Sequence, residues 1–265
     1  MSCNDTYKNR LNSFLNTEFI GRNFVFKEET DSTNSLAKRE NENSSGTVFM
    51  ADFQTNGRGR RGNTWISKKN EGLWFSILLK PDRFLEKLSC ITLVMGLAVN
   101  YALNKITGTK TFIKWPNDIV LNNKKVCGIL CEISYKNNEV DYIILGVGIN
   151  LYTEKFDDEI KKIATSVFLE TGKKIDKFEL LAEILNQFEP LYFEYLKNGM
   201  KNIINDYKIN CVTLDREVLV VMGDEKYKAY AKDINKDGEL VVLVDGERVA
   251  VSSGDVSVRG LFGYV

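Results

Sequence analysis

The chain has 265 residues, 43% of them hydrophobic, so it can bury the core of one large domain, or of a main domain with a small companion. Lys plus Arg and Asp plus Glu both number 36, which argues against a general nucleic-acid binder because such proteins usually carry a basic excess. The chain contains no histidine, and this excludes Ser–His and Cys–His catalysis and histidine-ligated metal centres.

The five cysteines are odd in number and scattered, which is typical of reduced thiols in a cytosolic protein. Cys127 and Cys131 are four residues apart, but no second pair completes a zinc site, so we expect both in the core. The N-terminus has no apolar run of signal-peptide length, and no segment reaches the ~18 apolar residues of a membrane span. We therefore expect a soluble cytoplasmic protein that does not bind membranes.

The first half of the chain predicts strands and helices in alternation. The expected elements are a short helix at 6–16, a strand at 23–29, a helix from a cap at Asp31, Ser32 or Thr33 to about 43, and strands at 47–54 and 72–81. The strongest helical pattern covers 85–108, where apolar residues recur near helical spacing and Gly108 supplies a stop.

The second half begins with three strand-like runs and ends in a change of texture. The expected elements are strands ending near 115 and at 125–135 and 140–151, hairpin turns at 122–124 and 136–139, mixed loop and short helix at 157–170, and helices at 177–197 and about 200–208. After about 211, five or so short strands suggest a small β-barrel. The fold class is therefore α+β, with a mixed sheet and helices in 1–210 and a small all-β domain in 211–265.

The stretch TNGRGRRGNTW, residues 55–65, is the most distinctive motif because it places three arginines and three glycines in eleven positions. Glycines allow close backbone approach to a ligand, and arginines offer paired donors to carboxylate or phosphate. A solvated hairpin tip is the simpler interpretation of such a loop. A P-loop lacks support because the Gly-Lys-Ser/Thr ending is absent. Gly-Arg segments that bind RNA are usually longer and lie in disordered tails.

Four further stretches carry polar or glycine residues at the ends or in the middle of apolar runs. KWPNDI, 114–119, presents a Lys, an Asn and an Asp where Pro116 ends a strand, although a plain Pro-Asn-Asp turn would look the same. KKVCGIL, 124–130, and GVGIN, 146–150, place glycine inside strands, which often marks close approach of a ligand. DSTN, 31–34, is by itself an ordinary helix cap.

Taken together and in this order, these five motifs resemble those of the biotin protein ligases, over about 22–260. The resemblance implies a class II synthetase-like catalytic domain, residues 1–210, and a small SH3-like C-terminal barrel, residues 211–265. It also implies a two-step reaction. Biotin and ATP form biotinyl-5′-AMP and pyrophosphate, and a lysine of a biotin carboxyl carrier protein then displaces AMP. Such chemistry needs cations and backbone donors rather than a protein nucleophile.

The resemblance assigns roles residue by residue. Arg60, Lys114 and Lys125 are implied as catalytic. The implied biotin-binding residues are Ser32, Thr33, Asn34, Gln54, Arg58, Gly59, Arg60, Trp65, Lys125, Gly128 and Gly148. The implied ATP-binding residues are Arg58, Arg60, Lys114, Asn117, Asp118 and Asn150. Mg²⁺ is expected with ATP, near Asp118 or Asn150, rather than in a site made by the protein alone. The sequence indicates no aromatic residue for stacking on adenine.

Two departures from the family pattern stand out. The family loop commonly has an arginine where this chain has Asn63, so we expect faster leakage of the adenylate unless Lys68 or Lys69 compensates. The DSTN stretch starts at residue 31, which leaves no room for the N-terminal DNA-binding domain of some members, and we expect no operator binding.

The partner and the competing functions follow from the same resemblance. The expected acceptor is the biotin carboxyl carrier domain of acetyl-CoA carboxylase or of another biotin-dependent carboxylase. Pairing into a homodimer through sheet edges occurs in the family and is left open by the sequence. A lipoate–protein ligase with the same adenylate chemistry is the nearest alternative, and a nucleic-acid-binding module is a more distant one.

Overall fold

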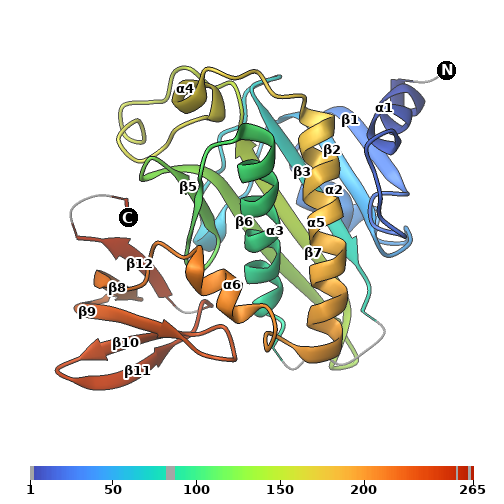
Figure 1. The fold of residues 1–265 in the computed structure, drawn as a ribbon. Coiled ribbons are helices and arrows are strands. Elements are labelled where there is room, and N and C mark those ends of the chain that lie inside the picture. The colour runs from blue at the N-terminus through green and yellow to red at the C-terminus, as the bar shows by residue number, and fades with distance from the viewer. Residues whose placement is uncertain (1–2, 82–86, 255, 262–263) are drawn as a thin grey trace.

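The computed structural model describes residues 3–81, 87–254, 256–261 and 264–265, and these residues form two β-sheets with helices packed on the larger one (Figure 1). The helices are α1 (Cys3–Asn12), α2 (Thr33–Arg39), α3 (Cys90–Thr107), α4 (Val167–Thr171), α5 (Lys177–Asn198) and α6 (Ile204–Ile209), with a 3-10 turn, η1, at Arg60–Gly62. The strands of the larger sheet are β1 (Phe24–Thr30), β2 (Thr47–Gln54), β3 (Gly72–Leu79), β4 (Phe112–Lys114), β5 (Asp118–Leu121), β6 (Lys124–Lys136) and β7 (Glu139–Asn150).

The larger sheet is mixed, in the order β1-β2-β3-β7-β6-β5-β4. Strands β1 and β2 pair in parallel, and every other neighbouring pair is antiparallel. The β5–β6 and β6–β7 hairpins close at the predicted turns, where Asn122, Asn123, Asn137 and Asn138 all have positive φ. Asparagine tolerates this left-handed conformation, so two-residue turns of this kind favour it. The α+β fold class predicted from the sequence is confirmed.

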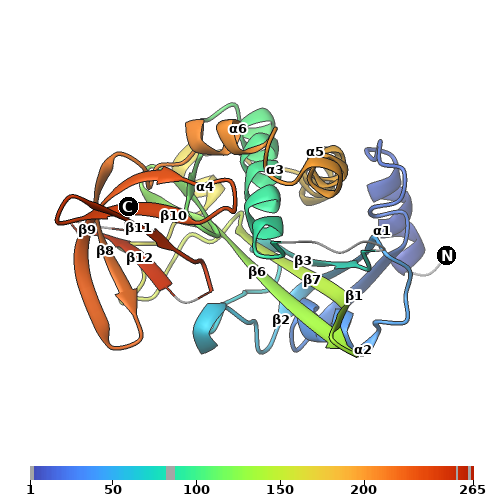
Figure 2. The ribbon, with the colours of Figure 1, turned by 90° about the horizontal axis from the view of Figure 1, so that it is seen from below.

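Helices cover the two faces of the larger sheet unequally (Figures 1 and 2). Helices α3 and α5 pack side by side on one face and form the main core with it. The short helix α2 lies on the other face, over β2, β3 and β7, with a small apolar cluster beneath it around Leu36 and Phe49. The glycine-arginine loop lies on this second face (Figure 2).

Helix α3 has the length and apolarity of a membrane span, so the prediction that no segment reaches them is wrong. Its 18 residues have a mean hydropathy of 1.3 and pass that test by length and composition. However, 72% of the helix is buried inside the protein, because it packs on the sheet beside α5. That is the environment of a core helix.

The remaining differences from the predicted elements lie at element ends. Helix α1 begins and ends earlier than 6–16, α2 ends at Arg39 rather than 43, and the first part of the predicted helix 85–108 falls partly on 82–86, outside the described residues. Strand β5 is a further difference, since Pro116 predicts the end of a strand and gives no sign of a new strand directly after it. The chain instead reverses at 115–117 and pairs again, with Lys114 opposite Asp118.

The C-terminal strands form a separate antiparallel sheet in the order β11-β10-β9-β8-β12. They are β8 (Arg216–Met222), β9 (Glu225–Ile234), β10 (Leu240–Val244), β11 (Glu247–Val251) and β12 (Val256–Gly260). Backbone hydrogen bonds join the residues before β8 to Ile113 in β4, and the Trp115 Nε1–H donates to the Gly238 carbonyl at 3.0 Å. The second sheet is thus anchored to the turn that carries KWPND. Closure of this sheet into a barrel stays a prediction.

Candidate functional site

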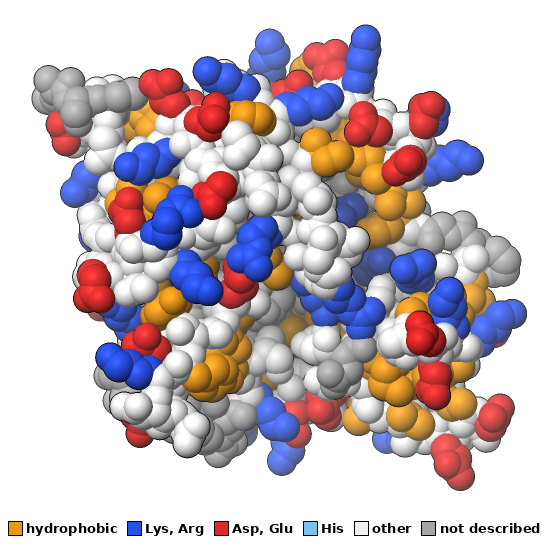
Figure 3. Space-filling view, turned by 180° about the vertical axis from the view of Figure 1, so that it is seen from behind, with side chains coloured by type: hydrophobic (Ala, Val, Ile, Leu, Met, Phe, Trp, Pro, Cys, Tyr) orange, Lys and Arg blue, Asp and Glu red, His pale blue; other side chains and the backbone are white. Residues whose placement is uncertain are grey.

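Two adjoining cavities open on the face of the sheet that carries α2 and the glycine-arginine loop. The larger one has a volume of about 670 Å³, within the range of ligand sites, and the smaller one about 50 Å³, enough for only a few water molecules. Lys and Arg side chains gather on this side of the molecule, over the junction with the C-terminal sheet (Figure 3). The residues that line both cavities are Gly59, Arg60, Trp65, Asn117 and Lys125.

One end of the small cavity is made by the first turn of α2. Ser32 caps this helix, its Oγ accepting from the Ser35 N–H at 3.4 Å, and the Thr33 N–H donates to Gln54 Oε1 at 2.8 Å. Gln54 ends β2 and thus faces α2 across the sheet edge. Ser32, Thr33 and Gln54 are all buried, so hydroxyl and amide groups are held in place where few water molecules can reach them.

Asn34 is fixed by two partners that the sequence analysis did not identify. Its Nδ2 donates to the Glu132 carboxylate at 2.7 Å, and its Oδ1 lies 2.6 Å from the Ser76 hydroxyl. Gly146 leaves the space for this amide, since a Cβ there would lie 2.1 Å from Asn34 Oδ1. Ser76 is the single polar residue of the apolar strand β3, and that pattern was the available signal for it. Strand β6 carries several polar residues besides Glu132, so its pattern gave no such signal.

Arg58 and Trp65 close the small cavity from the loop side. The Arg58 guanidinium pairs with the Glu132 carboxylate at 3.0 Å. The Trp65 indole lies against Gly128 and Gly148, because a Cβ at either position would come within 2.7 Å of the ring. Its Nε1 is buried and has no hydrogen-bond partner among the described residues. The indole therefore covers the two glycines and fills the space that their missing side chains leave.

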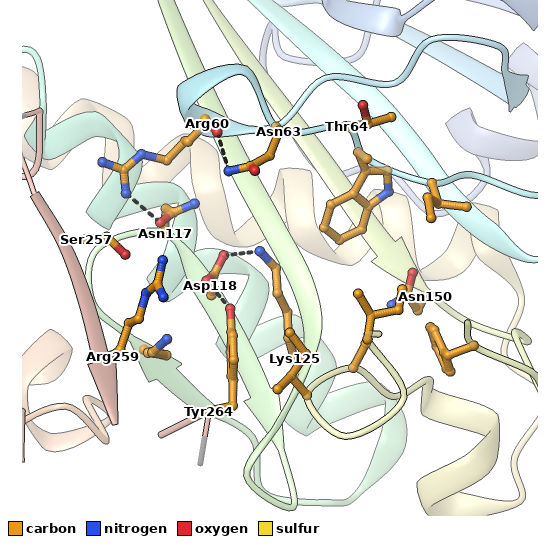
Figure 4. Close-up of a pocket in the computed structure, with 18 of the residues that line it drawn as sticks. Arg60, Asn63, Thr64, Asn117, Asp118, Lys125, Asn150, Ser257, Arg259 and Tyr264 are labelled. Carbon is orange, nitrogen blue, oxygen red and sulfur yellow. Dashed lines mark hydrogen bonds and ion pairs between the residues drawn. The ribbon is translucent and has the colours of Figure 1, made fainter. Parts of the chain in front are cut away.

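The larger cavity brings together cationic side chains from distant parts of the chain (Figure 4). They are Arg60 and Arg61 from the glycine-arginine loop, Lys68, Lys114, Lys125 and Lys155 from the larger sheet and its loops, and Arg259 from β12. Asp118 and Asp157 also line it, so cations predominate. The positive charge of this lining is complementary to a polyanion such as a nucleoside triphosphate.

Lys125 and Asp118 form the closest ion pair at the wall between the cavities. Lys125 Nζ lies 2.6 Å from Asp118 Oδ1, and the Tyr264 hydroxyl donates to Asp118 Oδ2 (Figure 4). Lys114, only 7% exposed, lies beside them. The pKa of Lys114 is lowered to about 8, chiefly by burial and also by the charges of Lys125 and Arg259, while Asp118 opposes this. Burial raises the pKa of the Asp118 carboxyl, but the charges of Lys125 and Lys114 outweigh this effect and keep the pKa below its usual value.

Arg60 ties the glycine-arginine loop to both sheets. Its Nη1 donates to Asn117 Oδ1 at 2.9 Å, and its Nη2 donates to the Ser253 carbonyl between β11 and β12. Asn117 is fixed in turn, because its Nδ2 donates to the Ile129 carbonyl at 3.0 Å. The guanidinium is thus held at the wall that the two cavities share.

The structure gathers the residues predicted for biotin around the small cavity and five of the six predicted for ATP around the larger one. Arg58 is the sixth, and in this conformation it lines only the small cavity. Asn150, whose Nδ2 donates to the Thr165 carbonyl, and Asn63 both line the larger cavity. Of the two lysines proposed to compensate for Asn63, Lys68 lines this cavity and Lys69 does not.

Two adjoining cavities with a shared cationic wall are the arrangement of a ligase that joins an acid to a nucleotide. The chain matches the Biotin/lipoate A/B protein ligase family over residues 26–150 and the Biotin protein ligase C terminal domain over residues 213–259. The structure is similar to that of the biotin protein ligase from Aquifex aeolicus in complex with biotin and ATP. The TM-score is 0.82 at 34% sequence identity, over 90% of this chain and 99% of that one.

Curated relatives agree with this class. The chain is 30% identical to the biotin–[acetyl-CoA-carboxylase] ligase of Mycobacterium tuberculosis over 217 residues, which is 80% of this chain and 78% of the relative. It is 38% identical to the bifunctional ligase/repressor BirA of Bacillus subtilis over 193 residues, 71% of this chain but only 59% of the relative's length. This chain belongs to the biotin protein ligase family.

Proposed function

We propose that this protein activates biotin with ATP and transfers it to a lysine of a biotin carboxyl carrier domain, in acetyl-CoA carboxylase or another biotin-dependent carboxylase. The observation that carries the proposal is the wall shared by the two cavities, where Arg60 and Lys125 face both. A carboxylate in the small cavity and a phosphate in the larger one would meet at these two cations. The biotin-bound and ATP-bound Aquifex relative supports this choice of substrates.

In the first step, the biotin carboxylate attacks the α-phosphate of ATP, forming the acyl-phosphate bond of biotinyl-5′-AMP and releasing pyrophosphate. Two anions must approach, and negative charge grows on the phosphoryl oxygens. Lys125 and Arg60 offset the repulsion between the anions, while the ammonium of Lys114 faces the developing charge. In the second step, the acceptor lysine amine attacks the acyl carbon and AMP leaves.

The cysteines of the described chain are not suited to act as nucleophiles. Burial raises the pKa of the Cys90 and Cys131 thiols to about 12, and it raises the pKa of Cys127 and Cys211 as well. A thiol with such a pKa is protonated at neutral pH and unreactive. Direct attack by the substrate carboxylate therefore agrees with the side chains present.

We infer that Mg²⁺ enters with the nucleotide, near Asp118 or Asn150. The described residues include no group of three or more His, Cys, Asp or Glu that could hold the ion, and Asp118 is already engaged by Lys125 and Tyr264. Mg²⁺ usually combines one or two carboxylates with substrate phosphates, and it would supply charge neutralisation there. We assign none of the steps above to the ion.

Transfer of radiolabelled biotin tests the proposed function directly. With ATP and a biotin carboxyl carrier domain, label should appear on the carrier lysine, and it should be absent when ATP is omitted or that lysine is replaced by arginine. Radiolabelled lipoate with a lipoyl domain tests the alternative, which the biotin-ligase relatives do not favour. Labelling with lipoate but not with biotin would contradict the proposal.

The low pKa of Lys114 predicts a pH dependence for the first step. If its ammonium assists ATP binding and attack, kcat/KM for ATP should be constant below about pH 8 and fall by up to tenfold per pH unit above it, because the free enzyme loses this charge as pH rises through the pKa. Biotin-dependent pyrophosphate exchange isolates this step from the acceptor lysine. Lys114→Arg should remove the fall at alkaline pH, and an identical profile in both proteins would contradict the assignment.

Asn63 predicts a difference in how firmly the adenylate is held. It lines the larger cavity, and its Nδ2 donates to the Arg60 carbonyl at 2.8 Å, so it brings no charge toward the phosphate. Asn63→Arg should slow release of biotinyl-AMP about tenfold, the usual effect of one hydrogen bond to a charged group. Asn56→Arg places the same charge on the exposed start of the loop, outside both cavities, and should leave release unchanged. Equal release rates in all three proteins would refute the idea.

We also propose that the chain forms two domains. Residues 1–210 would be the catalytic domain that binds biotin and ATP, and residues 211–265 would be a small accessory domain. Support comes from the two separate sheets and from the separate family matches. The free thiols of the described cysteines suit a cytoplasmic enzyme. The lack of operator and membrane binding and the formation of a homodimer stay predictions.

A further inference from the structure

Tyr264, the penultimate residue, lies among the charged groups of the larger cavity. Its hydroxyl donates to Asp118 Oδ2, and the face of its ring lies 3.7 Å from Lys114 Nζ, measured to the ring centroid. It comes from the segment after β12, beyond the last residue of either family match, and it reaches back to the larger sheet (Figure 4). One side chain thus contacts two charged residues of the KWPND turn.

The two contacts of Tyr264 act on different cations. By occupying Oδ2, the hydroxyl orients the Asp118 carboxylate so that Oδ1 faces Lys125 Nζ at 2.6 Å. A phenol that donates to a carboxylate makes one of the stronger kinds of hydrogen bond. The ring face attracts the Lys114 ammonium and shields it from water. Tyr264 therefore contacts Lys114 directly and Lys125 through Asp118, and its side chain lines the larger cavity with them.

Other contacts already attach the C-terminal sheet to this turn. The Trp115 N–H donates to the Thr213 hydroxyl at 2.9 Å, the Trp115 indole donates to the Gly238 carbonyl at 3.0 Å, and Ile113 pairs with Cys211. These contacts do not involve Tyr264. Its polar contacts are thus not needed for docking the two sheets, and their direct consequence is the placement of charge in the cavity.

We propose that Tyr264 is a positioning residue for adenylate formation, which orients Lys114 directly and Lys125 through Asp118. The proposal rests on the proposed biotin–ATP reaction. It gives the C-terminal sheet a role in the first chemical step, since β12 carries the chain back to the catalytic lysines.

Two substitutions separate the two contacts. Tyr264→Phe removes the hydrogen bond to Asp118 and keeps the ring over Lys114, and it should lower kcat for biotin-dependent pyrophosphate exchange about tenfold. Tyr264→Leu removes both contacts and should lower kcat about a hundredfold. In both, the Kd for biotin, measured calorimetrically, should stay within twofold of wild type. Tyr230→Phe, on β9 and outside both cavities, is the matched control and should change nothing.

Trace acetylation of lysines, read by peptide mass spectrometry, tests the contact without relying on activity. The reactivity of Lys114 relative to Lys124 should rise several-fold in Tyr264→Leu and stay near wild type in Tyr264→Phe. An unchanged Lys114 reactivity in Tyr264→Leu would overturn the proposal, as would wild-type kcat in both variants or a parallel loss of biotin affinity. If wild-type protein showed no biotin-dependent exchange, the proposed function would fail, while the labelling result would still report on Tyr264.

Discussion

Replacement of Lys125 by methionine is expected to lower the rate of biotinyl-adenylate formation by about 10²- to 10³-fold, the usual effect of removing one preorganised donor to a developing charge. Methionine keeps the length of the side chain and removes its charge. Lys125 lines both cavities, and its Nζ lies 2.6 Å from Asp118 Oδ1. The variant loses the cation where carboxylate and phosphate would meet, and it leaves Asp118 with the Tyr264 hydroxyl alone on its carboxylate.

Pyrophosphate exchange measures this effect, and the adjacent residue provides the control. Lys124→Met makes the same chemical change one position earlier in β6, at a residue that lines neither cavity, so exchange should stay near wild type. Thermal unfolding of both variants checks that they fold. A loss smaller than about fivefold in Lys125→Met would show that the charge of Lys125 is not needed for the step.

Replacement of Gly146 by alanine is expected to weaken biotin binding by about 10- to 100-fold, because overpacking of this kind costs roughly 1–3 kcal/mol. The added Cβ would lie 2.1 Å from Asn34 Oδ1 and 2.9 Å from its Cγ. Asn34 cannot easily move aside, since Glu132 and Ser76 hold its amide at 2.7 and 2.6 Å. The clash should therefore displace the first turn of α2, which forms one end of the small cavity.

Isothermal titration with biotin measures the change, and a second glycine-to-alanine variant controls for it. Gly96 lies in α3, and a Cβ there would meet its nearest neighbours at 3.8 Å, which is ordinary contact. Gly96→Ala should bind biotin as wild type does and should stabilise the protein by about 0.5–1 kcal/mol, since glycine weakens a helix interior. Wild-type biotin affinity in Gly146→Ala would contradict the role given to Asn34.

The sequence predicted many of the residues that line the two cavities, but it missed residues whose role depends on a neighbour. Ser76 lies in the otherwise apolar β3 and Glu132 lies among other polar residues in β6, and nothing in the sequence shows that both face Asn34. Gly146 stands in the GVGIN motif, yet only the position of the Asn34 amide makes a side chain there impossible. Hydrogen bonds between residues 98 and 42 positions apart leave no local pattern to detect.

Local sequence rules also failed where a single residue had two possible meanings. Pro116 ends β4, as its missing N–H requires, but the chain turns immediately into β5. A proline that breaks a ladder is equally compatible with a loop and with a tight reversal. Lys114 pairs with Asp118 across the turn, which shows that the chain makes a tight reversal here rather than a loop. Both side chains line the larger cavity.

By itself, the sequence determined the α+β class, the Asn-rich hairpin turns and the motifs that identify the family, because each depends on residues close together in the chain. It left the helix cap open among Asp31, Ser32 and Thr33, and the structure has Ser32 at this position. The tertiary structure alone decided that two cavities share the wall of Arg60 and Lys125, and that Trp65 covers Gly128 and Gly148. It also decided that Tyr264 returns to Asp118 from 146 residues away. Such contacts arise from the packing of two sheets against each other, and the energy of that packing is not encoded in any short stretch of residues.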